Sequence, residues 1–113
     1  MDEMQLHREA ADLGMQVVYL GLLRKGPKWS PEETPDSARL QDAHLANIGD
    51  MVEKGWLVLV GPCGDDGELR GIYVFRASSL AEAESMAATD PAIQAGRLIC
   101  ELHPWLVGRD SLP

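Results

Sequence analysis

The residue with the clearest chemical potential in this chain is His44. It lies in the apolar stripe of a predicted helix, one turn from Leu40 and one turn from Ile48. An imidazole exchanges protons near neutral pH, so His44 could serve as a general acid or base. A histidine on an apolar helix face can equally be a core residue that is hydrogen-bonded to backbone. The residues by themselves leave both interpretations open.

Asp90 is the second residue of interest, because it directly precedes Pro91. Aspartate at an N-cap, followed by proline at the first helical position, is typical of the start of a helical turn, and Gly96 can end that turn. Such a cap contributes about 1 kcal/mol and explains Asp90 in structural terms. The second carboxylate oxygen is still able to orient a histidine, so the two roles are compatible.

Metal, redox and phosphate chemistry find little support in the sequence. Cys63 and Cys100 form no CxxC pair, which argues against a redox motif and against a zinc knuckle. No neighbour in the sequence would activate the Cys63 thiol, and Cys100 fits a small core residue. The three histidines lack metal-ligand spacing, and the glycines do not form a phosphate loop. We therefore expect no metal and no cofactor.

Composition limits the choice of partners. The chain has 113 residues, of which 18 are acidic and 10 are basic, giving a net charge of -8. This field repels phosphate backbones and anionic lipids, so we expect neither nucleic acid nor membrane as a partner. The longest apolar run, residues 56–60, is far shorter than the ~20 residues of a membrane span. The N-terminus lacks the basic and apolar regions of a secretory signal, so we expect a cytoplasmic protein.

A strand and a long loop are predicted in the part of the chain that precedes the helix with His44. Residues 15–23 carry β-branched and large apolar side chains at both parities, as expected of a strand covered on both faces. Residues 24–35 contain three prolines and Gly26, which predict a loop. Trp29 lies in this loop. A large ring there most often packs onto apolar surface, and in a sharper interpretation it covers a ligand pocket.

The helix that carries His44 is expected to begin at a cap formed by Asp36 or Ser37. It should run to about residue 54, because Gly55 follows at the position where a left-handed residue commonly ends a helix. The apolar stripe of this helix comprises Leu40, His44, Ile48, Met51 and Val52.

Two apolar segments after this helix predict a β-hairpin. Residues 57–60 form a strand that Gly61 and Pro62 close, and residues 69–77 form the next strand. The Asp-Gly step between the two segments is typical of an antiparallel connection.

The remaining elements complete an α+β fold. Ser79 caps a second helix that extends to about residue 89, and residues 98–102 form a last strand, which Pro104 ends. The order strand-helix-strand-strand-helix-strand predicts the ferredoxin-like βαββαβ plan, a four-stranded antiparallel sheet with its helices on one face. The uncovered face is expected to be apolar and to need a partner, which a homodimer packing sheet against sheet would supply.

Several short stretches follow one another in a characteristic order and spacing: Lys25-Gly-Pro-Lys-Trp29, Ala43-His-Leu-Ala-Asn-Ile48, Gly61-Pro-Cys-Gly-Asp-Asp-Gly-Glu-Leu-Arg-Gly71, Ser79-Leu-Ala-Glu-Ala83, Thr89-Asp-Pro91, Ala95-Gly-Arg97 and His103-Pro-Trp105. Together they resemble the YCII-related (YciI-like) domain family over residues 16–107. We divide the chain into an N-terminal extension (residues 1–14), a YCII-related domain (residues 15–107) and a C-terminal tail (residues 108–113).

The resemblance implies a ferredoxin-like domain that dimerises into an α+β barrel, with a cleft holding a His-Asp pair. By motif, the pair maps to His44 and Asp90. One relative of this type is a dehydrochlorinase acting on a chlorinated hydroxyhydroquinone, so the scaffold can support chemistry. The further candidates for the cleft are Trp29 as a lid, Gly61 and Pro62 as a wall, and His103 as a second polar group.

The leading functional hypothesis is a small-molecule enzyme that uses the His-Asp pair in general acid-base catalysis. A lyase or isomerase step on a small cyclic or aromatic substrate is the expected reaction. Two alternatives remain: a module that binds a small metabolite without turnover, and a dimeric interaction subunit that uses the bare sheet face.

Overall fold

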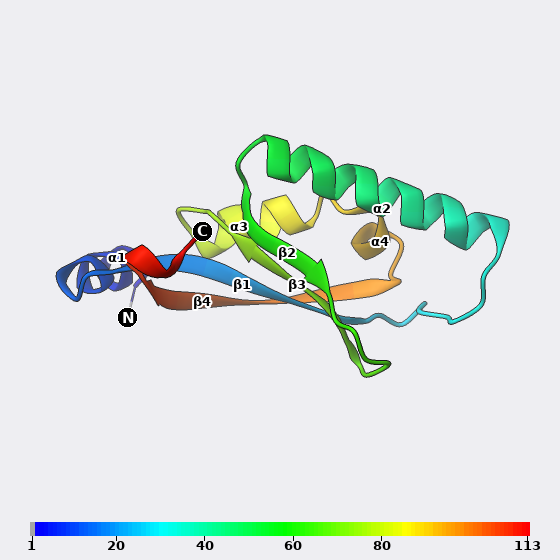
Figure 1. Cartoon of the computed structure of the whole chain (residues 1–113), viewed down its shortest axis with the longest axis horizontal. Coiled ribbons are helices and arrows are strands. Elements are labelled where there is room, and N and C mark those ends of the chain that lie inside the picture. Colours follow the sequence, from blue (N-terminus) through cyan, green and yellow to red (C-terminus); the bar gives the residue numbers. More distant parts are fainter. Residues whose placement is uncertain (1) are drawn as a thin grey trace.

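An antiparallel sheet with helices packed on one face forms the centre of the structure (Figure 1). The computed structural model describes residues 2–113. In chain order the elements are α1 (Glu3–Asp12), β1 (Met15–Lys25), α2 (Pro35–Glu53), β2 (Leu57–Pro62), β3 (Leu69–Phe75), α3 (Leu80–Ala87), α4 (Pro91–Gln94), β4 (Leu98–Gly108) and the 3-10 helix η1 (Arg109–Ser111).

The sheet order β2-β3-β1-β4 confirms the ferredoxin-like plan. Each neighbouring pair of strands is antiparallel, including the predicted β2–β3 hairpin. The helices α2, α3 and α4 lie on the same side of the sheet in Figure 1. β1 is a central strand that pairs with β4 along its whole length, which explains why its apolar side chains occupy both parities.

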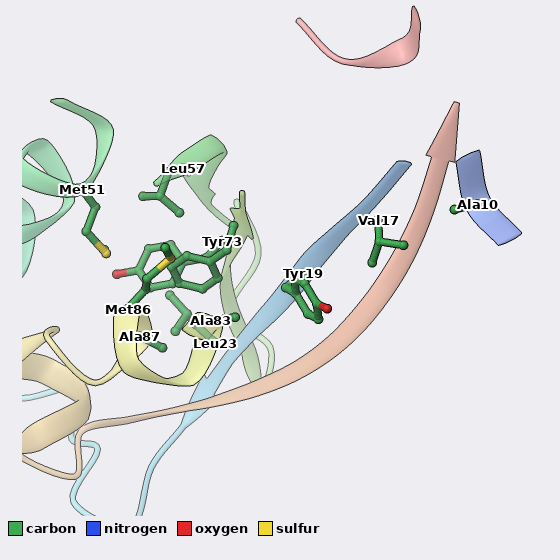
Figure 2. Close-up of a cluster of buried hydrophobic side chains, with 11 residues drawn as sticks. Ala10, Val17, Tyr19, Leu23, Met51, Leu57, Tyr73, Ala83, Met86 and Ala87 are labelled. Carbon is green, nitrogen blue, oxygen red and sulfur yellow. The ribbon is translucent and has the colours of Figure 1, made fainter. Parts of the chain in front are cut away.

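The main core lies between the sheet and the helices. Alternate side chains of β1, such as Val17 and Tyr19, point into it, and α2 contributes Met51. Small residues of α3 complete the packing. The cluster, drawn in Figure 2, comprises Ala10, Val17, Tyr19, Leu23, Met51, Leu57, Tyr73, Phe75, Ala83, Met86 and Ala87.

The opposite face of the sheet is apolar and only partly covered. A second buried cluster on this face is formed by Val18, Val74 and Val107. The C-terminal tail folds back through η1 and packs Leu112 against that cluster. By the strand register, three largely exposed apolar side chains share this outer face: Leu59, Ile99 and Trp105.

The start of α2 differs from the sequence prediction, because the cap is not Asp36 or Ser37. Thr34 is the N-cap, and its hydroxyl accepts a hydrogen bond from the Ser37 N–H at 3.1 Å. In return the Ser37 hydroxyl accepts one from the Thr34 N–H at 2.8 Å, a reciprocal capping box with Pro35 at the first helical position. The helix ends as predicted, with Gly55 in the left-handed region.

The last strand is longer than predicted, because proline does not end it. β4 continues past Leu102, and Pro104 lies within it opposite Tyr19. β4 is an edge strand, so a residue without an N–H can be placed there with no loss to a second neighbour. The other edge strand, β2, includes Pro62 for the same reason.

Smaller differences concern single side chains and strand ends. Val52 is 49% exposed, so it does not belong to the buried stripe of α2. β1 extends to Lys25 rather than residue 23, and β3 ends at Phe75 rather than residue 77. No helix in residues 2–113 combines the length and apolar character needed to cross a membrane.

The N-terminal residues, for which the sequence predicted no definite structure, form α1. The carboxylate of Glu3 accepts hydrogen bonds from the Tyr19 hydroxyl at 2.7 Å and from the Leu80 N–H at 2.6 Å. The bond from Tyr19, followed by that from Leu80, lowers the pKa of Glu3. These contacts fasten α1 to β1 and to the start of α3.

Candidate active site

Asp90 lies at the junction between α3 and α4, where its side chain is completely buried. As the N-cap of α4 it accepts a hydrogen bond from the Ala92 N–H at 2.9 Å. Pro91 follows at the first helical position, and Gly96 adopts a positive φ just after the turn, as the sequence predicted. The local backbone therefore fixes the position of the carboxylate.

His44 of α2 lies directly against this carboxylate. Its Nδ1 atom is 2.8 Å from Oδ1 and 2.8 Å from Oδ2 of Asp90. Tyr73 of β3 donates its hydroxyl hydrogen to Oδ2 at 2.6 Å, and Figure 2 shows this hydroxyl pointing away from the strand toward the helices. Together with the Ala92 N–H, three donors therefore bind this carboxylate, with the Nδ1 hydrogen shared between its two oxygens.

The electrostatics keep Asp90 ionised. Burial alone raises the pKa of Asp90, but the hydrogen bonds from His44, Tyr73 and Ala92 and the charge of His44 outweigh it, so the pKa lies below its usual value. Burial, and then the hydrogen bond to Asp90, raise the pKa of Tyr73, which therefore stays protonated and remains a donor.

The ionised carboxylate also determines the tautomer of His44. Because Asp90 can only accept hydrogen bonds, the Nδ1 atom must carry the hydrogen, and Nε2 of the neutral ring is free to accept a proton. Nε2 has no hydrogen-bond partner within residues 2–113, whereas every buried side-chain nitrogen and oxygen there has one. Nε2 is therefore accessible to solvent, although His44 as a whole is only 9% exposed.

A cavity of about 260 Å³ opens beside His44. Leucines from β1, α2 and β4 form apolar walls, and the polar side chains that line it are those of Gln41, His44, Arg70 and Arg97. Binding sites for drug-sized ligands usually span roughly 300–1,000 Å³, so this cavity is suited to a compound with one ring.

The structure brings three of the predicted cleft residues to this cavity and leaves one out. Trp29, Gly61 and Pro62 line it together with His44. His103 lies on the outer face of β4, exposed, with its Nε2 atom 2.8 Å from the carboxylate of Glu101. The prediction of His103 as a second polar group in the cleft is not supported by this position. The cause is that β4 continues past residue 102, and strand alternation turns His103 away.

Trp29 is held at the cavity by a close backbone approach between two loops. The Gly26 N–H donates to the Arg97 carbonyl at 2.8 Å, and the Lys28 N–H donates to the Gly96 carbonyl at 2.9 Å. A Cβ atom on Gly26 would overlap the carbonyl oxygen of Gly96, so glycine is required there. The Lys25 ammonium group lies 4.2 Å from the centroid of the Trp29 ring.

Sequence reasoning missed Tyr73, Arg70 and Arg97 as site residues. Tyr73 stands in the apolar part of β3, after Arg70. A buried tyrosine there indicates that its hydroxyl has a hydrogen-bond partner, but not which residue that partner is. Arg70 and Arg97 come from β3 and from the turn before β4, and only the folded chain places both at one cavity. No spacing rule in the sequence would have paired them.

Neither cysteine lines this cavity. Burial, and then the negative charge of Asp90, raise the pKa of the Cys100 thiol to about 12, so it stays protonated. Cys63 lines a different hollow beside β2. Within the described part of the chain, no three His, Cys, Asp or Glu side chains are grouped so that they could hold a metal ion.

Comparisons with known proteins agree with this fold. No curated protein matched the chain at the significance that we required. Among solved structures, the chain is similar to 5-chloro-2-hydroxyhydroquinone dehydrochlorinase (TftG) from Burkholderia phenoliruptrix AC1100, in complex with 2,5-dihydroxybenzoquinone. The identity is 22%, the TM-score is 0.53, and the alignment covers 80% of this chain and 93% of that chain, a likeness that shows the fold. Residues 19–105 match the sequence model of the YCII-related domain, and the protein therefore belongs to the YCII-related domain family.

Proposed function

We propose that this protein is a small-molecule enzyme in which His44 acts as general acid and base while Asp90 holds its ring. The proposed reaction is a lyase or isomerase step on a small cyclic or aromatic compound. One observation carries the proposal: His44 lines a cavity of about 260 Å³, while its Nδ1 atom is bound to a buried carboxylate and its Nε2 atom has no partner within residues 2–113. This arrangement presents a proton acceptor in a fixed direction.

In the proposed step, Nε2 of His44 accepts a proton from a ring carbon or a hydroxyl group of the substrate. The electron pair of the broken bond forms a new double bond. In an elimination, a leaving group such as chloride departs with the electron pair of its own bond, and His44 passes its proton to water. In an isomerisation, the imidazolium returns the proton to another atom of the ring. Asp90 stabilises the imidazolium in both cases.

The other residues around the cavity have supporting roles in this proposal. Trp29 acts as the lid, and Gly61 and Pro62 form part of the wall. Tyr73 is a positioning residue, because its hydroxyl contacts Asp90 and not the cavity.

The fold relative supports the class of reaction and the size of the substrate. The dehydrochlorinase that shares this fold is named for a chlorinated, hydroxylated single ring and is complexed with a single-ring quinone. The cavity beside His44 has the volume for such a compound.

Binding without turnover is the alternative for the same cavity. Its leucine walls and arginines would hold a metabolite whether or not His44 moves a proton. The two functions differ in the effect of His44 substitutions, which would alter affinity in a binding module and the rate in an enzyme.

The proposal also includes a homodimer formed through the outer face of the sheet. Leu59 and Trp105 are 60% and 46% exposed, and both line a hollow of about 340 Å³ on this face. Leaving a contiguous apolar surface in water is unfavourable, and a second copy of the same face would cover it.

His44→Ala should lower turnover by roughly 10²- to 10⁴-fold, the usual contribution of a positioned acid-base group. Chloride release from 5-chloro-2-hydroxyhydroquinone is a suitable first assay, followed by other hydroxylated rings. His7→Ala is the matched control, because His7 lies in α1 away from this cavity and should leave the rate unchanged. Undiminished turnover in His44→Ala would leave the binding module as the better account.

Asp90→Asn should destabilise the protein by roughly 1–3 kcal/mol at pH 7, because an amide cannot accept from all three donors. The folded state lowers the pKa of Asp90 below about 3.9, so its stabilising contribution is present above that pH and is lost as pH falls through the folded-state pKa. Urea unfolding of both proteins between pH 7 and pH 3 should show a stability difference that narrows below about pH 4. A difference in the free energy of unfolding that stays constant from pH 7 to pH 3 would contradict an ionised Asp90. Turnover should also fall, though less than in His44→Ala.

The protein should have the mass of a dimer in light scattering at micromolar concentration. Trp105→Arg should shift it toward the monomer, because a buried, unpaired charge in the interface is costly. Arg39→Gln changes an exposed charge that is paired with Asp36 on α2, on the other side of the sheet, and serves as a control that should remain dimeric. A monomeric wild-type protein would rule out the homodimer.

A further inference from the structure

The cavity beside His44 has an electropositive lining in an acidic protein. The chain carries a net charge of -8, yet among residues 2–113 the charged side chains that line this cavity are Arg70 and Arg97, with no Asp or Glu. Both arginines are half-buried. A local excess of positive charge in a concave site attracts anions and favours their binding.

Arg97 is not neutralised by the protein. Two arginines form ion pairs in the described chain: Arg24 is paired with Glu101, and Arg39 is paired with Asp36. Arg97 forms no ion pair there; its guanidinium lies 5.8 Å from the centroid of the Trp29 ring. The contact orients the guanidinium beside the proposed lid and leaves its charge uncompensated.

Arg70 is fixed in place without losing its charge. One terminal nitrogen of its guanidinium donates to the carbonyl oxygens of Asp65 at 3.0 Å and Gly67 at 3.1 Å, both in the β2–β3 connection. Carbonyl oxygens are neutral acceptors, so they hold the side chain without forming an ion pair. Arginine has five N–H donors in all, and those not used here remain for a ligand.

The nearest buried carboxylate does not compensate these arginines. Asp90 is completely buried and its oxygens are bound to His44, Tyr73 and Ala92. The charge of Asp90 is therefore compensated by these donors. The positive charges of Arg70 and Arg97, which line the same cavity as His44, can then attract an anion from solution.

We propose that the ligand of this cavity is a small ring that bears a carboxylate, with Arg70 and Arg97 binding the carboxylate and the ring lying between Trp29 and His44. A guanidinium matches the two oxygens of a carboxylate in a fork geometry. A carboxylic acid is ionised at neutral pH, whereas a simple phenol is mostly neutral. Phosphate is less suited, because phosphate sites usually add the N–H groups of a glycine-rich loop or helix N-terminus. The inference rests on the proposed function in one respect only: the proposed function determines that the ring, which lies beside His44, is the part of the ligand that reacts.

Isothermal titration calorimetry with a matched pair of probes tests the charge requirement. The probes are 2,5-dihydroxybenzoate and the neutral 2,5-dihydroxybenzamide, which have the same ring and nearly the same shape. The carboxylate should bind roughly 10- to 100-fold more tightly, the range expected for charge-assisted hydrogen bonds. Added salt should weaken binding of the carboxylate and leave that of the amide almost unchanged.

Substitutions then assign the effect to the cavity. Arg97→Gln and Arg70→Gln should each reduce carboxylate affinity by roughly tenfold or more without changing amide affinity. Arg97→Lys should keep part of the preference, because it retains the charge but loses the fork. Arg76→Gln is the control: it removes the same charge from an exposed position outside this cavity and should have no effect.

The outcome is separable from that of the catalytic proposal. His44→Gln should retain the preference for the carboxylate even though the proposed function predicts that it loses turnover. Equal affinity for the two probes in the wild-type protein would overturn the inference, and so would the absence of carboxylate binding at millimolar concentration. A preference that survives both glutamine substitutions would also overturn it.

Discussion

The buried charge of Asp90 is the interaction on which the rest of the structure depends. An isolated carboxylate without solvent would cost several kcal/mol, so it must be compensated by hydrogen bonds. The compensation comes from His44 of α2, Tyr73 of β3 and the Ala92 N–H of α4. Each donor belongs to a different element, and satisfying one carboxylate therefore ties the long helix, the sheet and the α3–α4 junction into one arrangement.

The same constraint orients His44 for the proposed chemistry. A carboxylate that only accepts hydrogen bonds requires hydrogen on Nδ1 of His44, and this leaves Nε2 as the unprotonated nitrogen of a residue that lines the cavity. Structure and proposed function are hard to separate at such a pair, because the contact that stabilises the fold is also the one that orients the proposed base. Arg70 and Arg97 lie outside this compensated network, which is why we propose that their charges bind a ligand.

The sequence predicted the fold and several residues of the candidate site, for identifiable reasons. Asp90 was found because Asp-Pro has a local capping signature, and His44 because it interrupts an apolar stripe; their pairing came from family resemblance. His103 was misplaced because the sequence alone does not show that β4 is an edge strand, where Pro104 is tolerated. Tyr73 was missed because its role depends on a contact 17 residues away in the chain that no local pattern encodes.

The most direct test of this account is the tautomer of His44, measured from the nitrogen-15 chemical shifts of its imidazole ring in solution. The account predicts that the neutral ring carries its hydrogen on Nδ1, hydrogen-bonded to Asp90, with Nε2 unprotonated and open to the cavity. In Asp90→Asn this preference should weaken or reverse, because an amide can donate to Nδ1. A neutral His44 with its hydrogen on Nε2 in the wild-type protein would contradict the account.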